Sequence, residues 1–371
     1  MRRKKILSVI LALVMVFGSV IPIAALPEHN YEICNVSNIL PIGDVTIVSS
    51  RFVEDSNLGL TMMESIDEYY RVIRTLVRDD VNPARVVLDI HAEASAILLM
   101  MGMNQYFIDG MSCEDLEFIA FSPSISTLAS YSRIDQFGNS VYIDRVTAHA
   151  IAEEARQAEL EMMQFFNNPM GLYGYNIQPF NSGSRHDGVM SLFHLASQNW
   201  SNRNSFMFHT DATWLNEPFM RLTDSIGSTA MSITADVTRA WAGGFSYTEN
   251  IIGPGSITSQ RISRNIQPEF RTNGNWNGAG ILFSLPRTWS DGWWSVTHRN
   301  MMAFSRFYGL LSHTTVHSFN SIGSYYHTSV SLNIRPSLSI GLGRSGVAAS
   351  IGLSIALRYV IPRHVQLTVL P

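Results

Sequence analysis

The second half of the chain contains runs in which apolar and polar residues alternate. The longest such pattern covers Ser329–Tyr359, with apolar residues at nearly every second position on both sides of Gly343-Arg344-Ser345-Gly346. Successive side chains of a β-strand point to opposite faces, so this period predicts two strands that each have one apolar face. The glycine-bounded segment between them supplies a turn. Residues 329–359 are therefore predicted to form a β-hairpin.

Shorter alternating runs occur throughout the same half. They are separated by residues typical of turns, including Gly253-Pro254-Gly255, Asn273-Gly274 and Asp291-Gly292. The runs cover 205–214, 231–241, 279–285 and 295–311. Many short strands with regular turn signals are typical of a sandwich or barrel. The second half is therefore predicted to be an antiparallel all-β domain.

The first half has a different spacing. Apolar residues recur at three and four positions over 61–77, which predicts a helix, and a second helix is expected over 84–103. Ser112 and Asp115 have the spacing of a capping box and predict a short helix from residue 113. A small hairpin is expected around Gly138, and an alanine- and glutamate-rich helix over 148–166. The predicted class is thus α+β, with an N-terminal helical region before the β domain.

The first 25 residues resemble a secretory signal. Four cations precede an apolar run, Ile6–Phe17, and the small residues Ala24 and Ala25 follow. This pattern predicts export with cleavage near Ala25, and an uncleaved membrane anchor is the alternative. The predicted organisation is a signal peptide (1–25), an N-terminal extended segment (26–60), an acidic helical region (61–170) and a basic antiparallel β domain (176–371).

Charge is divided unevenly between the two halves. Residues 26–175 contain 8 arginines and 22 acidic residues, a balance of −14, whereas residues 176–371 contain 14 arginines and 8 acidic residues, a balance of +6. Net charge affects association and does not determine the fold. The basic half is therefore predicted either to bind an anionic partner or to be covered by the acidic half of its own chain. Arg335, Arg344 and Arg358 are the candidates for a basic surface.

The chain has two cysteines, Cys34 and Cys113. Outside the cell they can pair as a disulfide, and such a long loop would give up to about 4.5 kcal/mol in the chain-entropy model. Two unpaired thiols fit the same spacing. The sequence leaves both possibilities open.

All seven tryptophans lie between residues 200 and 294. Three of them are in polar, turn-rich segments, and a flat indole beside amide and carboxylate groups suits a sugar ring, whose C–H face stacks on the aromatic ring. Tryptophans that fill the core and mouth of a sandwich are the alternative. The predicted ligand-binding residues are Trp276, Trp293, Trp294, Asn275 and Asp291.

Motifs that carry catalysis or metal binding are missing from the sequence. G-x-S-x-G, H-E-x-x-H and paired C-x-x-C are all absent. The eight acidic residues of the β domain could include a glycosidase pair, but a sequence does not report the separation of two carboxylates. No catalytic residue, metal ligand or cofactor is therefore predicted.

These observations predict a secreted, non-catalytic protein that binds an anionic or glycan polymer at the cell envelope through its β domain. One alternative is a membrane-active or pore-forming protein, because a hairpin with one aliphatic face and one small polar face also suits a membrane barrel. An extracellular hydrolase is a second alternative. A membrane surface is a possible partner, nucleic acid is not expected, and the helical region is a candidate intramolecular cover for the β domain.

Overall fold

Antiparallel β-sheet forms most of the described structure. This computed structural model describes residues 46–369 except for 56–57, 79–88, 135–139, 168–187, 217–222, 231, 237–238, 240, 254–255, 269–277, 287–288, 291–293, 313–318, 329–334, 344–345 and 355–359. All the described residues belong to one compact unit, Gly43–Pro371.

The larger sheet has twelve described strands, and every ladder in it is antiparallel. In spatial order its main path is β1 (Ile47–Asp55), β2 (Leu60–Asp67), β3 (Val72–Val77), β4 (Ser124–Ile134), β6 (Gly188–Gln198), β7 (Ser205–Asn216), β14 (Ser295–Leu311), β10 (Ala242–Gly253) and β11 (Ser256–Asn265). Beside this path, β5 (Ser140–Ile143) pairs with β4, and both β9 (Ile233–Ala235) and β13 (Trp289–Ser290) pair with β14.

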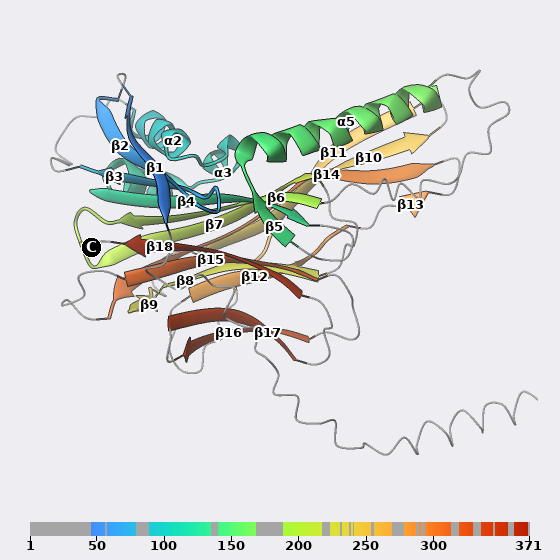
Figure 1. Cartoon of the computed structure of the whole chain (residues 1–371). Helices are drawn as coiled ribbons and strands as arrows, with labels where there is room; N and C mark the ends of the chain where they lie inside the picture. The colour runs from blue at the N-terminus through green and yellow to red at the C-terminus, as the bar shows by residue number, and fades with distance from the viewer. Residues whose placement is uncertain are drawn as a thin grey trace, which may run out of the picture. The chain divides into compact units, whose positions relative to one another are not determined.

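A smaller sheet packs against one face of the larger sheet (Figure 1). Its order is β12 (Gly278–Ser284), β8 (Thr223–Ala230), β15 (Phe319–Thr328) and β18 (Val360–Val369). The two sheets make a sandwich-like β architecture, which confirms the predicted antiparallel class of the second half. Strands β10, β11 and β14 extend past the end of the smaller sheet (Figure 1).

Strand β7 shows how the alternating sequence builds this arrangement. Phe206 and Phe208 point into the core between the two sheets, and Met207 points into a second core on the opposite face. Both faces of the strand are thus buried, as expected where a sheet is covered on both sides. The predicted strands over 205–214, 279–285 and 295–311 are confirmed as β7, β12 and β14. In the described part of the run over 231–241, the structure has the short strand β9.

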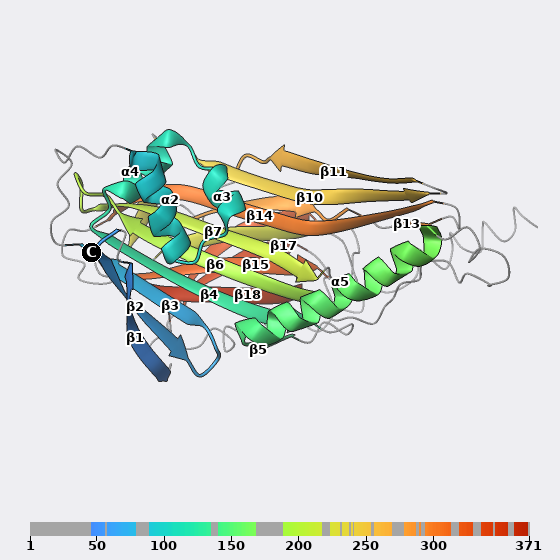
Figure 2. The same cartoon turned by 90° about the horizontal axis from the view of Figure 1, so that it is seen from above.

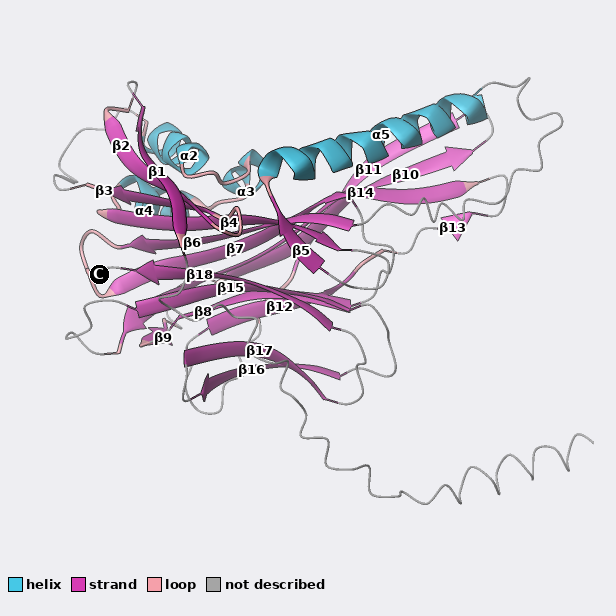
Figure 3. Cartoon of the chain, in the orientation of Figure 1, coloured by secondary structure: helices cyan, strands magenta, loops and turns pink. Residues whose placement is uncertain are grey.

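Helices cover the other face of the larger sheet (Figure 2, Figure 3). They are α2 (Ile90–Met100), α3 (Gln105–Asp109), α4 (Cys113–Ala120) and α5 (Arg145–Asn167). The predicted capping box is confirmed: the Ser112 hydroxyl accepts from the Asp115 backbone N–H, and the Asp115 carboxylate accepts from the Ser112 backbone N–H. The long predicted helix is confirmed as α5, and the second predicted helix, 84–103, is described in part as α2.

The helix predicted over 61–77 is wrong, because this segment forms strands β2 and β3. Asp67 ends the first strand: its carboxylate accepts hydrogen bonds from the backbone N–H groups of Tyr69 and Arg71, and Tyr70 adopts a positive φ of 60°. Such an Asx turn competes with a helix. The β-branched residues that follow, Val72 and Ile73 among them, favour a strand.

The N-terminal region is therefore not a helical region, and its strands belong to the sheet of the second half. Strand β4 pairs with β6 over ten residue pairs, from Ile125–Ser197 to Ile134–Gly188. The larger sheet continues across the segment that separates the predicted acidic helical region from the predicted β domain. The described helices are four, and three of them lie between β3 and β4.

The hairpin predicted at the end of the chain is present as β16 (Arg335–Gly343) and β17 (Gly346–Ser354), paired from Arg335–Ser354 to Gly343–Gly346. It lies against the outer face of the smaller sheet, where it contacts β8, β12 and β15 (Figure 1). Ile322 and Tyr326 on that face of β15 are buried. Among the described helices, none is both long and apolar enough to cross a membrane.

Candidate functional site

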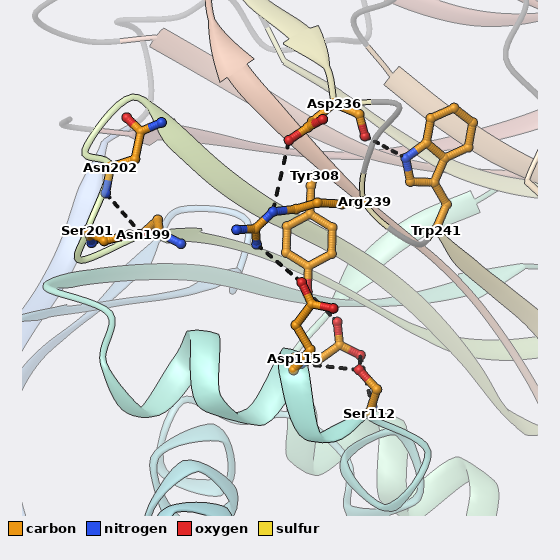
Figure 4. A network of polar contacts seen from close by, with 10 residues as sticks. Ser112, Asp115, Asn199, Ser201, Asn202, Asp236, Arg239, Trp241 and Tyr308 are labelled. Carbon is orange, nitrogen blue, oxygen red and sulfur yellow. Dashed lines mark hydrogen bonds and ion pairs between the residues drawn. The ribbon is translucent and has the colours of Figure 1, made fainter. Parts of the chain in front are cut away.

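A buried ion pair joins helix α4 to the larger sheet. The Arg306 guanidinium on β14 donates to the Asp115 carboxylate, and the side chains of Arg306 and Asp115 are 2% and 9% exposed. Tyr308, two residues along the same strand face, also donates its hydroxyl to Asp115. Figure 4 shows Asp115 between Ser112 and Tyr308, with Arg239 beside the tyrosine ring. An acidic residue of the first half thus neutralises an arginine of the second half.

Electrostatics of this buried cluster follow from the Arg306 charge. Burial alone would raise the pKa of Asp115, but Arg306 and the hydrogen bonds from Tyr308 and Ser112 bring that pKa below its usual value. Burial, together with the Asp115 charge, raises the pKa of Tyr308. The cluster is therefore a carboxylate–guanidinium pair with a neutral tyrosine, and it holds α4 on the sheet.

His209 and Asp211 lie beside this pair on β7, as their shared strand face predicts. His209 Nε2 is 3.1 Å from an Asp211 carboxylate oxygen, and Arg306 Nε donates to His209 Nδ1 at 3.4 Å. Burial, and then the Arg306 charge, lower the pKa of His209 well below its usual value. Burial raises the pKa of Asp211 well above its usual value, against the effect of Arg306. Burial therefore favours the uncharged form of each side chain.

A serine–histidine pair lies between the two sheets. His194 Nε2 is 2.6 Å from Ser321 Oγ, and its Nδ1 is 2.8 Å from Thr210 Oγ1. All three residues are fully buried, and a hydroxyl occupies the position that an acid would take in a hydrolase triad. Burial lowers the pKa of His194 to about 3. This geometry links the sheets and gives no access to a substrate.

A carboxylate in the same layer is also enclosed. Asp224 accepts hydrogen bonds from Tyr325 and lies 3.0 Å from His327 Nδ1, and the Tyr325 hydroxyl accepts from Trp214 Nε1 at 2.9 Å. Asp224, Tyr325 and His327 are each at most 2% exposed. The four side chains come from β7, β8 and β15, so they fasten the end of the smaller sheet onto the larger one.

Beyond this point β10, β11 and β14 extend past the smaller sheet (Figure 1), and several of their described side chains are exposed. Glu249 of β10 is aligned with His298 of β14 and Gln260 of β11. Gln260 Nε2 donates to Glu249 Oε1 at 2.7 Å, and His298 Nε2 is 3.3 Å from Glu249 Oε2. The His298 ring packs edge-on against Tyr247, which belongs to the inter-sheet core. This polar group therefore begins where the core ends.

Trp294 lies farther along the same face. A Cβ added to Gly253 would lie 2.2 Å from the Trp294 ring, so the indole rests directly on the glycine backbone. Residues 249, 251 and 253 of β10 share one face, as do residues 296 and 298 of β14, which Trp294 immediately precedes. Gly253 is four positions after Glu249, about 13 Å along the strand. We call Trp294, Gly253, Glu249, His298 and Gln260 the Trp294 row.

The Trp294 row combines an aromatic face with polar groups at its far end. Trp294 is 43% exposed, the Glu249 side chain is 20% exposed and Gln260 is exposed, whereas His298 is buried and supports Glu249 from below. Its carboxylate and amide supply both acceptors and donors. Among the described residues, no group of three His, Cys, Asp or Glu side chains could hold a metal ion. The row is thus suited to a ligand that has flat apolar faces and many hydroxyl groups.

The predicted site residues lie mostly outside the described part of the chain. Of the predicted ligand-binding set, the structure describes Trp294, whereas Trp276, Trp293, Asn275 and Asp291 fall outside. The same holds for Arg344, Arg358 and the side chain of Arg335. Cys113 is exposed at the start of α4, and Cys34 lies outside the described residues, so their pairing stays a prediction.

Sequence reasoning missed how the row is assembled. Nothing in the sequence distinguishes Glu249 from the other seven acidic residues of the β domain or places His298 beside it. The sequence Gly253-Pro254-Gly255 was the available signal, because a turn predicted there implies the strand register, observed between β10 and β11, in which Gln260 lies opposite Glu249.

Comparisons with known proteins add little to this geometry. No family model matches the sequence, and no curated protein matches it significantly. Among solved structures, the chain is similar to the CBM22-1–GH10 modules of endo-1,4-β-D-xylanase 10B of Clostridium thermocellum complexed with xylohexaose, with 10% identity and a TM-score of 0.11. The similarity covers 38% of this chain and 26% of the xylanase chain. A likeness this weak carries no argument about function.

Proposed function

We propose that this protein is an exported, non-catalytic binding protein that holds a glycan polymer of the cell envelope on the Trp294 row. One observation carries the proposal: an exposed indole lies against the Gly253 backbone, in line with the hydrogen-bonded Glu249, Gln260 and His298. A sugar ring can stack its C–H face on the indole while a neighbouring ring bonds to the carboxylate and amide.

The length of the row favours a polymer over a single sugar. About 13 Å separates the aromatic end from the polar end along the strand. A monosaccharide contacts one end at a time, whereas a chain of sugars reaches both. Gly253 contributes by lacking a side chain, since any larger residue would displace the indole from the sheet.

Binding fits the described residues better than hydrolysis does. The serine–histidine pair of His194 and Ser321 is fully buried, and the Asp224 carboxylate is enclosed by Tyr325 and His327. Glu249, in contrast, is partly exposed beside a tryptophan. The membrane alternative requires β16 and β17 to leave the smaller sheet, with which they are in contact.

A co-sedimentation assay tests the proposal. Protein of residues 26–371 is mixed with purified, insoluble wall glycan, with or without its anionic polymers, at low and high salt. Stacking and hydrogen bonding predict binding that persists at high salt, whereas attraction of exposed arginines to anionic groups is screened by salt. Soluble reducing ends are measured in the same samples, and their release would favour the hydrolase alternative.

Trp294→Ala is the informative variant, and Trp200→Ala is its matched control. Both tryptophans are 43% exposed, but Trp200 lies between β6 and β7 and packs edge-on against Phe121. We expect at least tenfold weaker binding for Trp294→Ala and little change for Trp200→Ala. Equal losses in both variants, or no binding by the unsubstituted protein, would contradict the proposal.

A further inference from the structure

Strand β1 forms an edge of the larger sheet. Among the described residues it pairs only with β2, so its outer backbone groups face no described strand. Figure 2 shows β1 at the margin of the sheet, on the opposite side from β11. An unpaired edge presents a row of N–H and C=O groups that can pair with another strand.

The side chains of β1 do not protect this edge. Phe52 is 76% exposed, and Met63, its cross-strand neighbour on β2, is 42% exposed. Val48 is also exposed, at 68%. Both edges carry exposed charged residues, Arg51 and Glu54 on β1 and Arg261 and Arg264 on β11, but among the described residues β1 alone of the two also exposes large apolar side chains. Of the two edges, β1 is the one suited to pairing.

The β1 sequence is compatible with pairing to itself in antiparallel orientation. If the twofold axis passes through Phe52, the two phenylalanines oppose each other, and Arg51 lies opposite Val53 of the second copy. Arg51, which bonds to Glu64 of its own chain, is then one diagonal step from Asp55 of the second copy on one side and from Arg51 of the second copy on the other. No like charges face each other directly over residues 49–55, where the β1–β2 ladder has no bulge.

We propose that two copies of this chain associate through β1, which makes one continuous sheet across a twofold axis. A C2 arrangement uses the same edge on both copies and leaves no further β1 edge open, so the assembly closes at two. Because β10 and β11 lie at the other end of the sheet order, the two Trp294 rows would remain open at the outer ends of the dimer.

Analytical ultracentrifugation of residues 26–371 tests the proposal over a wide concentration range. This range retains the whole compact unit, Gly43–Pro371. The unsubstituted protein should sediment as a dimer that dissociates on dilution. Phe52→Lys should raise the dimer Kd at least tenfold, because it removes the aromatic pair and places two like charges opposite each other.

Val146→Lys is the matched control, because Val146 is 79% exposed at the start of α5. Circular dichroism and thermal unfolding verify that both variants fold, as expected for changes at exposed positions. A monomer at all concentrations would overturn the proposal, including the case in which residues 26–45 cover β1. An unchanged dimer Kd for Phe52→Lys would overturn it as well. Neither result depends on glycan binding.

Discussion

Replacing Asp115 by alanine removes the only carboxylate that the described residues place against the Arg306 guanidinium at salt-bridge distance. Arg306 would then remain as a buried charge, with a long hydrogen bond of 3.4 Å to His209 Nδ1 as its remaining polar contact among the described residues. Tyr308 would lose the acceptor of its hydroxyl. Breaking a buried pair by removing one partner costs about 3 to 5 kcal/mol. That is a large part of the 5 to 15 kcal/mol typical of a folded domain.

Part of the stability lost in Asp115→Ala comes from the end of helix α4 and can be measured separately. Asp115 also closes the capping box of α4, and the loss of a helix cap costs about 1 kcal/mol. Ser112→Ala removes the cap and leaves the ion pair, so the difference between the two variants reports the pair. The double variant Asp115→Leu/Arg306→Met removes both charges, and such apolar replacements of buried pairs are often neutral or stabilising.

Equilibrium unfolding in urea, followed by circular dichroism, measures these free energies. We expect Asp115→Ala to lose at least 2 kcal/mol more than Ser112→Ala. The double variant should lose less than Asp115→Ala does. Two results would show that the ion pair does not hold α4 on the sheet. In the first, Asp115→Ala lowers the free energy of unfolding no more than Ser112→Ala does. In the second, the double variant loses as much free energy of unfolding as Asp115→Leu and Arg306→Met lose together.

Three further predictions concern packing and pH. Gly323→Ala should destabilise the protein by about 1 to 3 kcal/mol, because its Cβ would lie 2.9 Å from the His194 side chain between the sheets; an unchanged urea midpoint would contradict this. Gly253→Ala should weaken glycan binding like Trp294→Ala by displacing the indole, whereas Gly110→Ala, whose Cβ would make only ordinary contacts, should not; co-sedimentation compares them. Because burial lowers the pKa of His194 to about 3, the unfolded chain binds a proton below about pH 6.5 that the folded protein does not. The free energy of unfolding should therefore fall by about 1.4 kcal/mol per pH unit for that group as pH drops from about 6.5 towards 3, and equal urea midpoints at pH 6.5 and 5 would contradict this.

Alternating apolar residues and helix-capping motifs in the sequence correctly predicted individual strands and helix ends. The alternation over 295–311 matches β14, and the Ser112–Asp115 spacing predicted the cap of α4. The helix predicted over 61–77 is wrong because the apolar spacing of this segment fits the strand period of two residues as well as the helical period of 3.6. The sequence also does not mark the Asx turn at Asp67, which separates the two strands. Buried Glu64, which bonds to Arg51 and Arg74, gives β2 a polar interior position that a periodicity argument treats as exposed.

Long-range pairing was beyond the sequence for a physical reason. Asp115 and Arg306 are separated by 191 positions, and His194 and Ser321 by 127. Which strands become neighbours depends on the packing of whole faces, and a single sequence does not reveal that order. The charge asymmetry did not single out Asp115 and Arg306 as the residues that pair. It did not indicate that both belong to one continuous sheet and its helices.

Isothermal titration calorimetry of residues 26–371 with soluble oligosaccharides from purified wall glycan tests the central claim most directly. We predict saturable binding whose affinity increases as the oligosaccharide lengthens towards the span of about 13 Å of the Trp294 row. Trp294→Ala should weaken this affinity at least tenfold, and Trp200→Ala should leave it unchanged. Binding that is independent of length and unaffected by Trp294→Ala, or no heat of binding at any length, would contradict it.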